Sequence, residues 1–186
     1  FELPLLGAAQ RENVAVAVTA LEVLSDILSI ELAFVKGLEQ VRWPGRLMEV
    51  SSQPSIWLDG SHNPQGGAVL AENLRASFPE QEISFIVGFL EDKDVEGYVR
   101  TWHKRAHRVW AVPLSCSRGL SAEEAALRAR MGGAHADACS LQEAWSEAAA
   151  WAQMEVGRMV VVCGSLYLMG ACEEEGLLNA DLFLLK

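Results

Sequence analysis

The sequence predicts an α/β fold, a three-layer sandwich in which a mostly parallel, Rossmann-like sheet is covered by helices on both faces. Three observations support this prediction. Strand-like and helix-like segments alternate beyond residue 46. The strand-like segments are short, nearly continuous apolar runs, which are typical of strands buried on both faces. Polar loops containing glycine follow several of these runs directly, as expected at the strand-to-helix connections of such a sheet.

The N-terminal part has a different pattern. Residues 8–25 are rich in alanine, and their apolar side chains recur at helical spacing, at Val14, Val18, Leu21 and Leu24. A second, short helix is predicted over 30–39, and a Trp-Pro-Gly turn follows it. We therefore predict two parts, a helical segment with a linker over 1–40 and an α/β domain over 41–186.

The α/β domain is expected to contain six strands, at 46–51, 55–59, 83–89, 108–114, 134–139 and 159–164. Its helices are expected at 64–77, 94–105, 122–131, 140–156 and 165–175. Asn63 before Pro64 and Ser121 before its helix are good N-cap residues, and Glu124 is spaced for a capping box with Ser121. The apolar residues 177–186 fit either a packed tail or an edge strand.

Composition excludes several classes of function. The chain has 25 acidic and 15 basic residues, and its net charge of −10 opposes non-specific binding to nucleic acid. No apolar run reaches the roughly 18 residues that span a membrane. The N-terminal FELPLLG has no basic region, so it is not a signal peptide, and it reads as a position inside a longer chain. Four cysteines without CxxC spacing indicate reduced thiols, hence a cytoplasmic protein.

The loop after the strand 55–59 contains the most informative residues. Ligands of open α/β sheets lie beyond the carboxyl ends of strands, and a helix N-terminus there favours phosphate. The Asp59 carboxylate can accept hydrogen bonds from both hydroxyls of a ribose, and His62 can donate to a phosphate oxygen. The same residues also fit an ordinary turn, in which Asp59 closes the loop and His62 is exposed.

Three further loops carry candidate binding residues. In Trp-Pro-Gly-Arg, a rigid turn aims Arg46, whose fork of donors suits phosphate, although it also fits an ordinary surface arginine. Lys93 follows the strand 83–89 and can bind an anion, or it lies in a solvated loop in which Asp94 caps the next helix. Ser165 follows the strand 159–164 and offers a hydroxyl, or it is only an N-cap. If these strands are neighbours, the loops converge on one site.

The motifs WPGR, LDGSHNP, GFLEDKD and GSLY, in this order, resemble the C-terminal domain of folylpolyglutamate synthase and bifunctional dihydrofolate synthase, in the muramyl-ligase superfamily. LPLLGAAQRENVAVAVTALEVL resembles the end of that family's central ATPase domain. The resemblance covers nearly the whole chain and is strongest over 41–64 and 163–170. Two positions depart from it, since Ser61 and Val14 stand where the family usually has alanine.

The resemblance implies an ATP-dependent ligase. Such an enzyme activates a carboxylate of folate or dihydropteroate as an acyl phosphate, which the amine of L-glutamate then attacks. It implies that Arg46 and His62 lie near the ATP phosphates and that Asp59 holds the ribose. It also implies that Lys93 and Ser165 lie near the glutamate and the acyl phosphate.

Part of the machinery of such a ligase is missing from the sequence. No G-x-x-x-x-G-K-[ST] loop occurs, so the phosphate cradle and the ligands of Mg²⁺ are expected in an N-terminal and central ATPase domain outside these residues. No metal site is predicted within the chain, because basic residues crowd His103 and His107. We expect the chain alone to be inactive.

Two other functions were weighed. A non-catalytic nucleotide-binding α/β module is the main alternative, because one fold supports many functions. A serine hydrolase is disfavoured, because neither Ser61 nor Ser165 lies in the G-x-S-x-G turn that such a nucleophile requires.

Overall fold

The structure is a computed structural model that describes residues 3–29, 34–41 and 43–178. The chain divides into two compact units, Phe1–Trp43 and Pro44–Lys186. The predicted helix 30–39 is partly outside the described residues, and so is most of the tail 177–186.

The N-terminal unit contains two helices, α1 (Ala8–Leu28) and α2 (Val35–Glu39), which agree with the predicted helical pattern. None of its described residues is buried. Several apolar side chains of α1 are strongly exposed, among them Val16, Val23, Leu24 and Ile27. The described part of this unit therefore has no core of its own. No described helix combines the length and the apolar character that crossing a membrane requires.

The second unit is built on a six-stranded sheet in the order β1-β2-β6-β3-β4-β5. The strands are β1 (Met48–Ser52), β2 (Ser55–Asp59), β3 (Glu82–Val87), β4 (Ala106–Ala111), β5 (Ala136–Ala138) and β6 (Arg158–Cys163). Strand β1 runs antiparallel to β2, and the other neighbouring pairs are parallel. The prediction of a mostly parallel sheet is confirmed.

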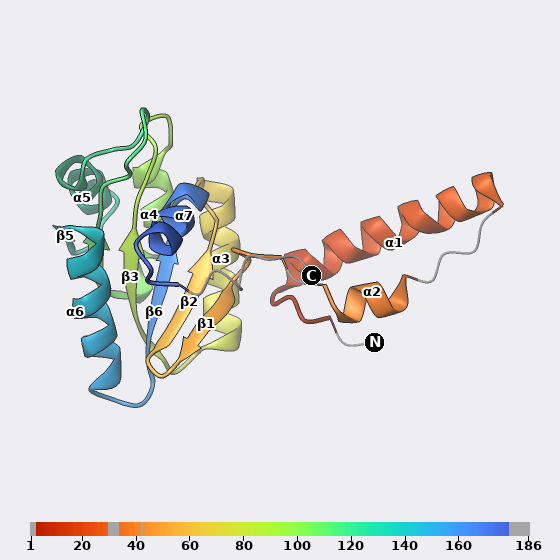
Figure 1. The fold of residues 1–186 in the computed structure, drawn as a ribbon, viewed down its shortest axis with the longest axis horizontal. Helices are drawn as coiled ribbons and strands as arrows, with labels where there is room; N and C mark the ends of the chain where they lie inside the picture. Colours follow the sequence, from red (N-terminus) through yellow and green to blue (C-terminus); the bar gives the residue numbers. More distant parts are fainter. Residues whose placement is uncertain (1–2, 30–33, 42, 179–186) are drawn as a thin grey trace. The chain divides into compact units, whose positions relative to one another are not determined.

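Helices cover both faces of this sheet, as Figure 1 shows. They are α3 (Pro64–Ser77), α4 (Val95–Trp102), α5 (Ala122–Met131), α6 (Leu141–Gln153) and α7 (Leu166–Glu174). Helices α3, α4 and α5 pack against one face, and α6 and α7 pack against the other. The prediction of a three-layer sandwich is therefore confirmed.

The central strands β3 and β6 explain the continuous apolar runs in the sequence. Side chains of a strand alternate between its two faces. In β3, Phe85 lies in the core formed with α3–α5, where it stacks on Trp102 at 4.2 Å between ring centroids. Ile86 lies in the core formed with α6 and α7. Because each face is covered, nearly every residue of these strands is apolar; burial of one such side chain contributes about 1.5–3 kcal/mol.

Several predicted element ends differ from the structure by up to three residues, among them the end of α6 at Gln153. The strand predicted over 108–114 is β4, which ends at Ala111; Pro113 lies just beyond it and has no N–H to donate to a neighbouring strand. The helix predicted over 94–105 is α4, which ends at Trp102 and continues as a 3₁₀ turn, His103–Arg105. His107 then lies in β4, so it does not share a helix with His103.

The predicted capping box at α5 is incomplete. Ser121 does cap α5, since its hydroxyl accepts a hydrogen bond from the Glu124 amide at 3.2 Å. The Glu124 carboxylate, however, pairs with Arg128. A complete capping box occurs instead at the start of α6, between Ser140 and Glu143. The Ser-x-x-Glu spacing is the same at the start of α5 and at the start of α6. At α5, Arg128 lies one turn after Glu124 and pairs with its carboxylate, so that carboxylate does not complete the box.

Candidate functional site

The predicted loops meet at one edge of the sheet. Strands β2, β6 and β3 are parallel neighbours, and their carboxyl ends are in register: Asp59 pairs with Cys163, and Cys163 pairs with Val87. The loops that follow these three strands carry His62, Ser165 and Lys93. The condition on which the predicted site depended, that the strands lie side by side, is therefore met.

Asp59 joins the Trp-Pro-Gly-Arg turn to the end of β2. Its Oδ2 accepts a hydrogen bond from the amide of Leu47 at 3.0 Å, and its Oδ1 accepts one from the amide of Ser61 at 2.9 Å. A second tie runs from the amide of Gly60 to the carbonyl of Gly45, at 2.7 Å. Arg46 is exposed between two buried neighbours, and its charge acts on the Asp59 carboxyl, so the turn brings this arginine near Asp59.

The turn holds one residue in an unusual backbone conformation. Leu47 has a φ of 41°, a left-handed value that residues with a side chain adopt only at a cost. Its side chain is buried, and its amide is the one that Asp59 accepts. The packing of Leu47 and the Asp59 hydrogen bond together stabilise a conformation that the sequence alone would not favour.

The carboxyl of Asp59 is only 7% exposed. Desolvation by burial raises the pKa of this carboxyl, although hydrogen bonds from Ser61 and Leu47 and the charge of Arg46 act against it. Because the pKa of Asp59 is higher in the folded state than in the unfolded state, the contribution of this carboxyl to stability is present at low pH. That contribution is lost as the pH rises through the folded-state pKa. A ligand that donates hydrogen bonds to Asp59 would favour the ionised form.

His62 lies at the start of α3. Its Nδ1 is 3.0 Å from the carbonyl oxygen of Gly60. A carbonyl only accepts, so Nδ1 carries a proton and donates, and Nε2 is the ring nitrogen left to meet a ligand. Nε2 donates to a phosphate oxygen only when the ring is an imidazolium. Asn63 caps α3, as predicted, by accepting from the amide of Gly66 at 2.8 Å.

A network of buried hydrogen bonds holds the loop after β2 against the core. The Ser61 hydroxyl is 2.9 Å from the hydroxyl of Tyr98, which projects from α4 and is fully buried. Burial raises the pKa of Tyr98 well above its ordinary value, so the phenol stays neutral. The carbonyl of Ser61 also accepts from the amide of Gly164 at 3.0 Å. The network thus connects α4, the loop after β2 and the loop after β6.

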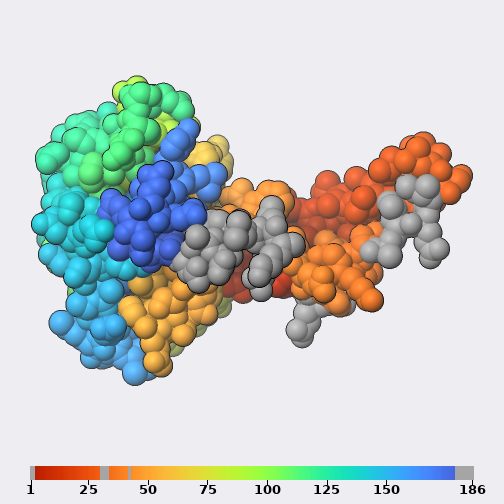
Figure 2. Space-filling model, viewed as in Figure 1, coloured from red at the N-terminus to blue at the C-terminus, as the bar shows by residue number. Residues whose placement is uncertain are grey.

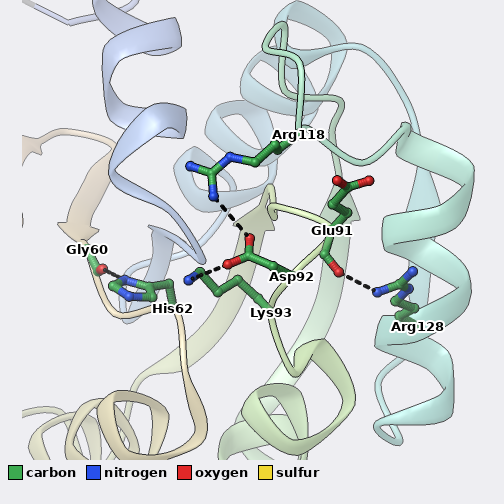
Figure 3. Close-up of polar contacts among 7 residues, drawn as sticks. All are labelled: Gly60, His62, Glu91, Asp92, Lys93, Arg118 and Arg128. Carbon is green, nitrogen blue, oxygen red and sulfur yellow. Dashed lines mark hydrogen bonds and ion pairs between the residues drawn. The ribbon is translucent and has the colours of Figure 1, made fainter.

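Lys93 lies in the loop after β3 and pairs with its neighbour Asp92, with Nζ 3.0 Å from Oδ2. The other oxygen of Asp92 is 3.8 Å from Nη1 of Arg118. Figure 3 shows these side chains at the same edge of the sheet as His62. Asp94 caps α4, by accepting from the amide of Gly97 at 2.8 Å. The capping alternative for Asp94 is confirmed, and it leaves Lys93 at the edge of the site.

Ser165 is the N-cap of α7. Its hydroxyl oxygen accepts a hydrogen bond from the amide of Tyr167 at 3.1 Å, and the residue is 4% exposed. Ser165 is thus an N-cap, and its predicted binding role stays a prediction. A cavity of about 310 Å³ lies between the start of α7 and the loop after β4; Leu114, Cys116, Leu166, Tyr167 and Gly170 are among its lining residues. Figure 2 shows α7 in blue beside this green loop.

The structure thus brings all five candidate residues to one edge, namely Arg46, Asp59, His62, Lys93 and Ser165. Among the residues described, no three His, Cys, Asp or Glu side chains gather closely enough to hold a metal ion. Tyr98 and Arg118 are not among the residues predicted from the sequence. No local motif marks Tyr98, whereas Arg118 lies in the loop that follows the predicted strand 108–114, at the same edge of the sheet.

Comparisons with known proteins agree with this architecture. Residues 47–174 match the sequence model of the family described as dihydrofolate synthetase, C-terminal domain. The chain is 34% identical over 182 residues to a probable dihydrofolate synthetase of Schizosaccharomyces pombe, covering 91% of this chain and 43% of that protein. It is 33% identical over 178 residues to a folylpolyglutamate synthase of Lacticaseibacillus casei, covering 93% of this chain and 40% of that protein.

Solved structures agree as well. A Mycobacterium tuberculosis folylpolyglutamate synthase, complexed with ADP and AMPPCP, matches with a TM-score of 0.78 and 29% identity. The match covers 93% of this chain and 41% of that one. The chain thus spans about two fifths of the length of these relatives. It belongs to the folylpolyglutamate and dihydrofolate synthase family, and its residues 47–174 correspond to the C-terminal domain of those enzymes.

Proposed function

We propose that this chain is the C-terminal part of an ATP-dependent ligase that adds L-glutamate to folate or dihydropteroate through an acyl phosphate. The observation that carries the proposal is the hydrogen bond from the Leu47 amide to Asp59, at 3.0 Å. This bond holds the turn that carries Arg46 against the strand end that carries Asp59 and His62. Three groups suited to a nucleotide therefore share one edge of the sheet.

The nucleotide would be bound by these three residues. Asp59 would accept hydrogen bonds from the ribose hydroxyls, using lone pairs that its two amide partners leave available. Arg46 and His62 would donate to phosphate oxygens. Donors that face the phosphates stabilise the charge that develops there during phosphoryl transfer, which is the main contribution a protein makes to this reaction.

Lys93 and Ser165 would act on the other side of the reaction. The hydroxyl oxygen of Ser165 already accepts from an amide, so its proton is available for an oxygen of the acyl phosphate. Lys93 would supply positive charge for the incoming glutamate. Ser165 follows β6, the neighbour of β2, and Lys93 follows β3, the next strand in the sheet, which supports these roles.

We assign the divalent metal, proposed to be Mg²⁺, to an N-terminal ATPase portion. A Yersinia pestis relative has been solved with AMPPNP and a manganese ion. In this chain, no suitable group of ligands gathers among the described residues, and no G-x-x-x-x-G-K-[ST] loop occurs in the sequence. The chain's own residues would therefore bind and orient the substrates around a nucleotide whose metal is held elsewhere.

The same N-terminal portion is the partner that the proposal requires. Residues 1–40 would be the terminal helices of that ATPase portion and the linker from it. The exposed apolar residues of α1 fit this role: the side chain of Val16 is 71% exposed and that of Ile27 is 72% exposed. All four cysteines are free thiols, which supports a cytoplasmic protein.

The test compares variants in the complete enzyme, which is this chain joined to the N-terminal ATPase portion. Arg46→Ala and His62→Ala should each lower kcat/KM for ATP by about tenfold or more, the loss expected for one charge-assisted hydrogen bond. Arg100→Ala, which removes an exposed arginine of α4, is the matched control and should leave this value unchanged. Glutamate-dependent ATP hydrolysis is the measurement.

The outcomes separate the proposals. Absence of glutamate-dependent ATP hydrolysis by the complete enzyme would reject the ligase. Unchanged kcat/KM in both variants would reject the site residues. The chain by itself is expected to show no turnover; tight ATP binding by the chain alone, without a partner, would instead favour the nucleotide-binding module.

A further inference from the structure

The loop after β4 is fastened to the loop after β3 by main-chain hydrogen bonds. The amide of Glu91 donates to the carbonyl of Arg118, and the amide of Leu120 donates to the carbonyl of Phe89, both at 2.9 Å. Leu90 and Gly119 form an isolated antiparallel bridge between them. The main chain at Arg118 is therefore held in a fixed position over the end of β3.

Close packing reinforces this position. A Cβ atom added to Gly119 would lie 2.0 Å from the carbonyl oxygen of Leu114, so only glycine fits between the two turns of the loop. Leu120, which follows, is buried. Arg118 thus extends from a rigid support, although its own side chain is 54% exposed.

Arg118 and Lys93 bracket one carboxylate, that of Asp92 (Figure 3). Lys93 Nζ lies 3.0 Å from one oxygen, and Arg118 Nη1 lies 3.8 Å from the other. The hydrogen bond from Lys93 is the main cause that lowers the pKa of Asp92, so this group is ionised at neutral pH. Two cations therefore face this one carboxylate, in a chain whose net charge is −10.

Arg118 still has donors for a ligand. At 3.8 Å its contact with Asp92 is an ion pair without hydrogen-bond geometry, and a guanidinium has five N–H donors. The nearby Arg128 differs, because its Nε donates to the Glu124 carboxylate at 2.8 Å and its Nη1 to the Glu91 carbonyl at 3.3 Å. Arg128 therefore braces the loop, whereas Arg118 points into the edge where the substrates would meet.

We propose that Arg118 is a specificity-determining residue that, together with Lys93, binds one carboxylate of the incoming L-glutamate. This proposal rests on the ligase function proposed above and names the recognition of its amino-acid substrate. A carboxylate fits because its two oxygens match the planar fork of a guanidinium. Lys93 and Arg118 both lie close to the Asp92 side chain, so the two cations face one small region, and each has further N–H donors beyond this contact.

The experiment compares Arg118→Gln with Arg100→Gln in the complete enzyme. Both changes remove one positive charge from an exposed arginine, and only the first lies at this edge. Arg118→Gln should raise KM for glutamate about tenfold, the effect of losing one charge-assisted hydrogen bond. KM for ATP should stay within about twofold, because Arg46 and His62 are unchanged. Arg118→Lys should recover part of the loss, because it keeps the charge but not the fork.

Two amides of glutamate provide a readout that a general disturbance of the loop would not reproduce. L-Glutamine lacks the side-chain carboxylate, and L-isoglutamine lacks the α-carboxylate. If Arg118 binds the side-chain carboxylate, the inhibition constant of L-glutamine should be nearly the same in Arg118→Gln as in the unaltered enzyme. If it binds the α-carboxylate, the same should hold for L-isoglutamine. Inhibition constants that both rise as much as KM for glutamate would overturn the proposal, and so would an unchanged KM. An unaltered enzyme without glutamate-dependent activity would instead reject the ligase function itself.

Discussion

At the scale of single residues, Asp59 has a structural role beside its proposed ligand role. Its two oxygens hold the amides of Leu47 and Ser61, and through them the turn of Arg46 and the loop of His62. Loss of this carboxylate would therefore move two other candidate ligands as well. Loss of activity in an Asp59 variant would not separate contact with the ribose from positioning, which is why the tests above use Arg46 and His62.

The hydroxyl pair of Ser61 and Tyr98 gives a stability prediction at the same scale. The two oxygens lie 2.9 Å apart in a buried environment. Ser61→Ala and Tyr98→Phe should each lower the free energy of unfolding, because each leaves one buried hydroxyl without its partner. The double variant should cost less than the sum, with a coupling energy of about 1 kcal/mol. Urea denaturation of the four proteins measures it.

This double-mutant cycle measures the Ser61–Tyr98 interaction only if both hydroxyls are removed without other changes in packing. Alanine and phenylalanine differ from the native residues by one hydroxyl each, so packing around them is otherwise kept. Strictly additive effects would mean that the 2.9 Å contact does not stabilise the loop.

At the scale of elements, a polar residue at the N-cap starts each helix of the α/β unit. Asn63, Asp94, Ser121, Ser140 and Ser165 all accept a hydrogen bond from an amide in the first turn. For α3, α6 and α7 this cap lies within four residues of the end of a strand. Short connections of this kind place helix starts at the edge of the sheet where the candidate ligands gather.

The β6–α7 connection requires a glycine. Gly164 has a φ of 101°, and a Cβ added there would lie 2.8 Å from the carbonyl oxygen of Gly88. Gly164→Ala should lower the free energy of unfolding by about 2–4 kcal/mol, because it combines backbone strain with a clash against main chain. Thermal or urea denaturation of the chain measures the loss.

Gly170 is the matched control within the same element. It lies inside α7, and an added Cβ would meet nothing within 4 Å. Gly170→Ala should therefore raise stability by about 0.5–1 kcal/mol, the helix propensity gained over glycine. Equal effects of the two substitutions would contradict the special role assigned to Gly164.

At the scale of the whole molecule, the buried core belongs to the second unit. All buried residues among those described lie at or beyond Gly45, and they fill both faces of the sheet. We therefore expect the fragment 44–186 to fold by itself and to unfold in one cooperative transition in urea, monitored by tryptophan fluorescence and circular dichroism. A broad, non-cooperative transition would show that residues before Pro44 are needed for this fold.

The sequence determined the class of the fold and predicted the residues of the candidate site. Apolar runs such as Phe85–Val87, flanked by helical segments, require a sheet covered on both faces. Consecutive side chains of a strand point to opposite faces, and all of them are buried only when both faces are covered. Strand ends followed at once by N-caps identified the loops of Asp59, Lys93 and Ser165. These are local signals, since period, caps and turns depend on residues close in the sequence.

Only the tertiary structure decided which loops meet and what each side chain contacts. Strand β6, the last in the sequence, lies between β2 and β3, and no local pattern encodes that order. Three contacts, namely the Leu47–Asp59 and Ser61–Tyr98 hydrogen bonds and the Arg118–Asp92 ion pair, join residues separated by 12, 37 and 26 positions. Such contacts depend on how the helices and strands pack together, and this packing brings together residues that are far apart in the sequence.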